Sequence, residues 1–152
     1  MFGLFKSKRQ KWKEKSTKAF DNIIPSIQGM DSQEIGGILD IAAKIKRSSL
    51  LTAPQDDPYH YAFNDPMKLG EERAFYYLEY WQKTMEEWAG TIEGNAKVGA
   101  MSIWWLSLSA CNIAELRIRG RELWSLLERG FEHCNYHEPD SLIPNGLSPK
   151  IS

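Results

Sequence analysis

The feature that most limits how this chain can fold is the stretch from Val98 to Ala114, which carries no charged side chain. Apolar residues occur on every side of a helix drawn through it, which indicates a helix buried all round or a membrane span. At about 17 residues the stretch is barely long enough for a bilayer, and it contains polar side chains that cost free energy in lipid, namely Ser102, Ser107, Ser109 and Asn112. We therefore predict a central helix over residues 96–118, with a span as the alternative.

Further helices are predicted on either side of this stretch from apolar residues at helical spacing. Asp31 and Glu34 have the spacing of a capping box and begin one helix, while Asp65 and Pro66 are expected to begin another. The apolar stripes of these two helices comprise Ile35, Ile38, Leu39, Ala42 and Ile45, and Ala74, Leu78, Trp81, Met85 and Trp88. A third follows the central helix, with Gly120 as a break or bend and a stripe of Leu123, Leu126, Leu127, Phe131 and Cys134.

The predicted fold class is an all-α bundle of about five helices around the central helix, forming one domain. Its parts are a basic amphipathic N-terminal helix or arm (1–24), a bundle core (25–137) and an irregular tail containing prolines (138–152). Pro25 is expected to end the first helix. A long ordered loop is predicted over 48–65, because prolines punctuate it while Tyr59, Tyr61 and Phe63 alternate. That loop is either functional or a cover for one end of the bundle.

Charge is unevenly distributed: residues 1–20 have a net charge of +6 and the remainder −7. The basic segment has three interpretations. It is a solubilising helix docked by Trp12 and Phe20, a contact with anionic membrane, or a contact with nucleic acid, which the acidic remainder disfavours. The residues predicted for membrane or phosphate contact are Lys6, Lys8, Arg9, Lys11, Trp12 and Lys13.

Candidate metal ligands gather near the end of the last predicted helix, at His133, Cys134 and His137. Zinc accepts such side chains, but a closed structural site needs four. The alternative is a helix C-terminus, where histidine interacts favourably with the helix dipole. No nucleotide-binding loop, hydrolase elbow or zinc-protease motif occurs. His60 beside Asp56 and Asp57 is the remaining acid–base candidate. We expect no catalytic residue and no cofactor.

Acidic and aromatic residues are abundant around the third predicted helix, and they suit a basic protein partner with tyrosine anchors. Glu79, Glu86 and Glu93 recur every seven residues and are expected to share one strip. The predicted partner-binding residues are Glu72, Glu79, Glu86, Glu87, Glu93, Tyr76 and Tyr80. A solvated helix face has the same composition, which leaves that interpretation open.

The leading hypothesis is a small protein-binding module, most concretely an inhibitor or immunity-type protein that neutralises a toxin or enzyme by covering its basic active site. Two cysteines without a disulfide framework favour the reducing cytoplasm. Two alternatives remain: a helical enzyme or metal-binding module using His133, Cys134 and His137, and a peripheral membrane adaptor anchored by the basic N-terminal helix.

Overall fold

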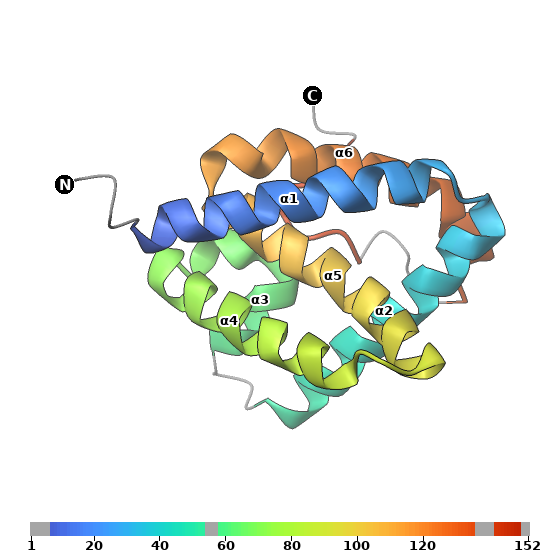
Figure 1. Cartoon of the computed structure of the whole chain (residues 1–152), viewed down its shortest axis with the longest axis horizontal. Helices are drawn as coiled ribbons and strands as arrows, with labels where there is room; N and C mark the ends of the chain where they lie inside the picture. Colours follow the sequence, from blue (N-terminus) through green and yellow to red (C-terminus); the bar gives the residue numbers. More distant parts are fainter. Residues whose placement is uncertain (1–6, 54–57, 136–141, 150–152) are drawn as a thin grey trace.

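The computed structural model describes residues 7–53, 58–135 and 142–149, and over these ranges the structure is helical, without a β-strand. Six α-helices lie in the described ranges, together with four short 3₁₀ turns (Figure 1). They are α1 (Lys8–Gln28), α2 (Ser32–Thr52), α3 (Tyr61–Asn64), α4 (Glu71–Trp88), α5 (Ile92–Asn112) and α6 (Arg117–Leu127), with 3₁₀ turns at Pro58–His60, Pro66–Lys68, Ala114–Leu116 and Glu128–His133. The prediction of an all-α bundle is confirmed.

Helix α5 occupies the middle of the molecule, with α1 and α6 on one side and α4 on the other (Figure 1). Every residue from Ile103 to Cys111 is buried, which explains why this part of the helix lacks charges and is apolar all round. Ser102 and Ser107 each donate to the carbonyl four residues earlier at 2.7 Å, and the Ser109 hydroxyl pairs with that of Ser16 in α1. Across the described ranges, no helix combines the length and apolarity that crossing a bilayer requires.

The bounds predicted for the central helix were wrong at both ends. The helix begins at Ile92 because Thr91 caps it by accepting a hydrogen bond from the Gly94 N–H at 2.9 Å. It ends at Asn112, whose side-chain amide donates to the Pro66 carbonyl at 3.0 Å, and Ile113 is extended. Residues 113–118 therefore belong to the turn and to the start of α6 rather than to the central helix.

Gly120 lies inside α6 rather than at a break, and it brings α6 close to α5. A Cβ atom at this position would lie 2.6 Å from the Cβ atom of Ala110, which is closer than side chains pack. The glycine that suggested a break or bend in the helix is therefore required for the close packing of α6 on α5.

Helix α1 continues to Gln28, past the predicted end at residue 24, and packs on the bundle along its length. Pro25 lies within it, where its missing N–H leaves the carbonyl of Asp21 without a helical partner. Because Asp21 is exposed, water can satisfy that carbonyl. Trp12, Phe20, Ile24 and Ile27 are buried. No break at residue 24 separates an arm from the bundle.

The predicted loop over 48–65 is mostly helical where the structure describes it. The capping box of Asp31 and Glu34 is confirmed, and α2 continues through Thr52 before Ala53 becomes extended, as a residue preceding a proline does. A 3₁₀ turn and α3 follow from Pro58, whereas residues 54–57 lie outside the described ranges.

The predicted start of the third long helix at Pro66 was also wrong. Pro66–Lys68 forms a 3₁₀ turn, and Gly70 has a φ of 82°, which interrupts the helical path before α4 begins at Glu71.

The C-terminal tail described at 142–149 contains no α-helix, as predicted, but it packs against the bundle. Leu142 and Leu147 are fully buried, and the Asn145 N–H donates to the Asn64 carbonyl at 3.0 Å.

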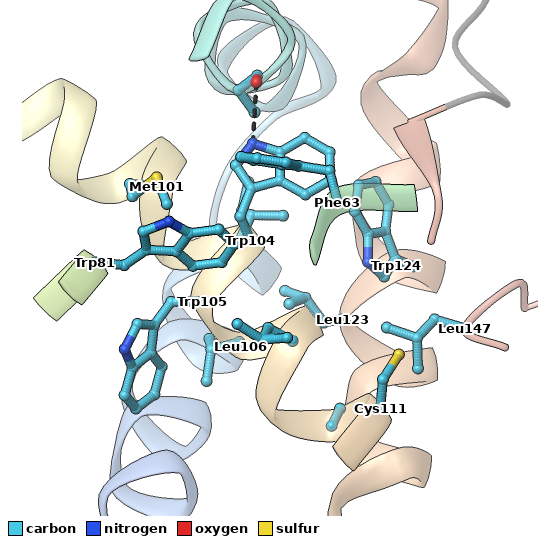
Figure 2. Close-up of a cluster of buried hydrophobic side chains, with 14 of the residues drawn as sticks. Phe63, Trp81, Met101, Trp104, Trp105, Leu106, Cys111, Leu123, Trp124 and Leu147 are labelled. Atoms are coloured by element: carbon cyan, nitrogen blue, oxygen red, sulfur yellow. Dashed lines mark hydrogen bonds between the residues drawn. The ribbon is translucent and has the colours of Figure 1, made fainter. Parts of the chain in front are cut away.

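Tryptophans from several helices meet around α5 (Figure 2), and the indole N–H groups of Trp81, Trp104, Trp105 and Trp124 are paired. Trp104 donates to the Ala42 carbonyl of α2 at 3.0 Å, and Trp124 donates to the Ser107 hydroxyl at 2.9 Å. The Phe63 ring packs edge-on against Trp104, with 5.3 Å between centroids. Paired N–H groups let these large rings be buried without an unsatisfied donor.

Candidate protein-binding face

Helix α4 has one buried face and one exposed face, and its exposed face carries most of the predicted partner-binding residues. Ala74, Leu78 and Trp81 point into the bundle. On the outside, Tyr76 is 66% exposed and Tyr80 is 56% exposed. These positions are four apart, so the two rings lie on adjacent turns of one helix face. Aromatic rings presented this way are typical anchors of protein interfaces.

Acidic residues border the two tyrosines and form what we call the acidic ridge: Glu72, Glu79, Glu86 and Glu87, all exposed. Lys83 pairs with Glu79 at 3.8 Å. Even so, α4 as a whole carries five acidic and two basic side chains, for a net charge of −3. The ridge therefore carries net negative charge beside the exposed rings, and its Glu72 and Glu79 share a hollow with Lys8, Arg9 and Lys11 of α1.

Glu93 does not belong to this ridge, contrary to the prediction from the seven-residue spacing. Helix α4 ends at Trp88, and Glu93 lies in the first turn of α5. The chain changes direction between the two helices, so the helical period cannot be counted across the junction. Glu93 instead lines a hollow with Lys44 and Lys97.

Between α2 and α4 lies an open groove of about 540 Å³, which we call the tyrosine groove. Four tyrosines and two tryptophans contribute to its walls, together with three hydroxyl side chains. The lining residues are Ile45, Ser49, Thr52 and Ala53 from α2, Tyr59, then Tyr76, Tyr77, Tyr80, Trp81, Thr84 and Trp88 from α4, and Met101 from α5. The groove and the acidic ridge share the outer side of α4.

Tyr59 forms part of the groove wall and joins it to the core. Its hydroxyl accepts a hydrogen bond from the Trp81 indole N–H at 2.9 Å, and burial raises the pKa of the phenol, which stays protonated at neutral pH. The Tyr77 ring lies 4.9 Å from Tyr59 and 5.6 Å from Tyr76. The exposed Tyr76 ring therefore rests on the half-buried rings of Tyr77 and Tyr59, which restrict its movement.

The basic N-terminal helix is partly neutralised by the rest of the molecule. Arg9 pairs with Glu115 and, at 3.3 Å, with Glu71, while Lys13 lies 3.3 Å from Glu115. The hydrogen bond from Arg9 lowers the pKa of Glu115 to about 2, despite some desolvation. Trp12 is only 3% exposed, so its indole does not face outward. Lys8 and Lys11 remain exposed, and Lys6 lies outside the described ranges.

The proposed metal ligands have other contacts where the structure describes them. The Cys134 thiol lies 3.3 Å from Asp40, which also accepts hydrogen bonds from the Asn135 backbone and side chain at 2.6 and 3.0 Å. His133 lies 3.5 Å from Glu132. Within residues 7–53, 58–135 and 142–149 no three potential ligands gather in a metal-binding arrangement. His137 lies outside these ranges, as do Asp56 and Asp57 beside His60.

No protein-family model matches this chain, and no match is found among curated proteins or solved structures. The binding properties of the face are therefore inferred from its own residues. Sequence reasoning identified its ridge and its exposed tyrosines but missed the groove residues from α2, Ser49 and Thr52, and the inner ring of Tyr59. The alternation of aromatics around Tyr59 was a usable signal, since it placed large rings in a segment otherwise expected to be a loop.

Proposed function

We propose that this protein is a protein-binding module that grips a basic partner with the exposed face of α4. The observation that carries the proposal is the side-by-side placement of the acidic ridge and the two exposed tyrosines, Tyr76 and Tyr80. Negative charge accelerates encounter with a positive surface, and tyrosine rings supply buried contact area once the partner has docked.

The packing beneath Tyr76 supports the proposal. Tyr76 packs against Tyr77, and Tyr77 packs against Tyr59, whose hydroxyl is fixed by Trp81. Rings that are already ordered lose little conformational entropy on binding, which favours affinity.

The most concrete form of the proposal is an inhibitor or immunity-type protein in the cytoplasm. An acidic surface of this kind covers a basic active site by charge complementarity and thereby neutralises a toxin or enzyme. Both cysteines are free thiols, in keeping with a reducing compartment.

A charge-reversal capture experiment tests the proposal. Immobilised wild-type protein, a ridge variant (Glu79→Lys/Glu87→Lys) and a control variant (Glu122→Lys/Glu132→Lys) are each exposed to lysate of the source cells. All four positions are exposed, and both variants change the net charge equally. We expect a basic partner that is captured by the wild type and the control, is lost with the ridge variant, and is released by salt.

Capture of the same partner by wild type and ridge variant alike would contradict the proposed face. The inhibitor form is tested next by adding the captured partner's own activity assay: we expect loss of that activity with wild type and its retention with the ridge variant.

A further inference from the structure

The tyrosine groove adjoins a second hollow beside α2, and we call the two hollows together the channel. The second hollow measures about 480 Å³ and shares Ile45, Ser49 and Trp88 with the tyrosine groove. Along α2 the lining runs from Ile41 to Ala53, a length of about 18 Å at the helical rise of about 1.5 Å per residue. A channel of this length fits a short peptide segment rather than a single side chain.

The walls of the channel exclude one common mode of peptide binding. They come from α2, α4, α5 and the 3₁₀ turn at Tyr59, and backbone groups inside a helix already bond to one another. A bound peptide therefore cannot be recognised by strand addition, which needs unpaired backbone groups at a sheet edge. Recognition must use the ring faces and the side-chain hydroxyls of the lining.

Ring faces and hydroxyls together suit an extended proline-rich segment. Such a segment adopts the polyproline II conformation, whose proline rings pack on aromatic faces and whose carbonyls have no internal partner. The hydroxyls of Tyr76 and Tyr80 can donate to those carbonyls, whereas a helical ligand would leave them unused. About six residues at about 3.1 Å each span the channel.

The charges at the two ends of the channel differ and give the ligand a direction. Glu79 and Glu87 border Tyr76 and Tyr80 on the exposed face of α4, just outside the lining of the groove, whereas the second hollow is lined by Lys44 and Lys97 with Glu93. An arginine or lysine of the ligand is therefore stabilised at the tyrosine end, by the ridge carboxylates and by the ring faces.

We propose that the channel between α2 and α4 binds a proline-rich segment of a partner protein, with a basic residue of that segment seated against Tyr76, Tyr80 and the acidic ridge. This inference rests on the proposed function and deepens it, because it specifies which segment of a basic partner binds to the face.

Fluorescence anisotropy with three dye-labelled synthetic peptides tests the inference on the full chain. The first alternates prolines with apolar residues and ends in two arginines, the second replaces its prolines by alanine, and the third replaces its arginines by glutamine. We expect saturable binding of the first, at least tenfold weaker binding of the second, and at least threefold weaker binding of the third. Only the first two should weaken further as salt is raised.

Two variants locate the binding. Tyr76→Ala/Tyr80→Ala should weaken the first peptide at least tenfold, while Tyr61→Ala, which removes an exposed tyrosine outside the channel, should leave its affinity unchanged. Circular dichroism checks that both variants fold.

The outcomes separate this inference from the proposed function. Equal binding of the proline and alanine peptides would overturn the inference, because charge alone would then explain the affinity. So would failure of all three peptides while a captured partner still depends on the ridge; in both cases the proposed function stands. Failure of the peptides together with ridge-independent capture would overturn both.

Discussion

The two aromatic regions of this molecule, the tryptophan core around α5 and the tyrosine groove beside α4, are built from similar rings but differ in what surrounds them. In the core, Trp104 and Trp124 are buried and their N–H groups bond to α2 and α5. In the groove, Tyr76 and Tyr80 have more than half of their surface in water. Aromatic content therefore serves stability in one region and, by our proposal, binding in the other.

Truncating one ring from each region should give the largest contrast. Trp104→Ala leaves a cavity at the centre of the bundle and removes the hydrogen bond to the Ala42 carbonyl, so we expect a loss of about 3–5 kcal/mol in the free energy of unfolding. Tyr80→Ala should change it by no more than about 0.5 kcal/mol. Urea titration followed by circular dichroism measures both. Similar losses for the two variants would mean that the groove is part of the stabilising core.

Two neighbouring glycines of α2 allow a tightly packed position and an open position to be compared within one helix. In α2, a Cβ on Gly36 would lie 2.6 Å from the Cβ of His133, whereas one on Gly37 would meet nothing within 4 Å. Gly36→Ala should therefore destabilise the protein by about 1–3 kcal/mol through overpacking, and Gly37→Ala should stabilise it by about 0.5–1 kcal/mol. Thermal unfolding of the two variants provides the measurement. A melting temperature that rises for Gly36→Ala would refute the close packing of α2 against the Glu128–His133 turn.

The contact between α1 and the acidic side chains should appear as a smaller, pH-dependent effect. Because the pKa of Glu115 is lowered to about 2 in the folded state, the unfolded chain binds more protons between about pH 4.5 and 2. The stabilisation is therefore present above pH 4.5 and is lost as the pH falls through this window. We expect Glu115→Gln to be less stable than wild type at pH 7 and equal to it near pH 2, as measured by urea titration at each pH. A constant difference across that range would argue against the pairing with Arg9.

The acidic ridge is where we expect substitutions to have the smallest effect on stability and the largest effect on binding. The ridge reversal Glu79→Lys/Glu87→Lys alters exposed side chains only, so the free energy of unfolding should stay within about 0.5 kcal/mol of wild type. A thermal melt of the purified variant, run beside Glu122→Lys/Glu132→Lys, decides this. If the ridge variant alone unfolds early, its loss of partner would reflect misfolding rather than a lost surface.

Local signals in the sequence predicted local structure well. The uncharged stretch from Val98 indicated the buried helix, and Asp31 with Glu34 indicated the start of α2, because burial and capping leave direct marks on residue type. Pro25 led to a wrong prediction of the end of α1. Because Asp21 is exposed, water can bond to the carbonyl that the proline leaves without a helical partner, and the helix continues. Glu93 misled because residue spacing carries meaning only within one helix.

The groove was not predictable in the same way. Its ridge and outer tyrosines repeat along α4 and can be read from spacing, but Ser49 and Tyr59 reach it from other elements. Their approach to Tyr77 depends on how α2, the 3₁₀ turn at Tyr59 and α4 pack on α5. Residue spacing within one segment predicts the helix itself but not this packing.

The ring contacts that run inward from the groove also give the molecule an optical property. Tyr76 touches Tyr77, Tyr77 touches Tyr59, and Phe63 and Trp104 continue the series to Trp124. Light absorbed by a tyrosine at the surface can thus be emitted by an indole in the interior. An unlabelled molecule that settles on Tyr76 should alter the colour or intensity of that emission, so the protein reports its own occupancy.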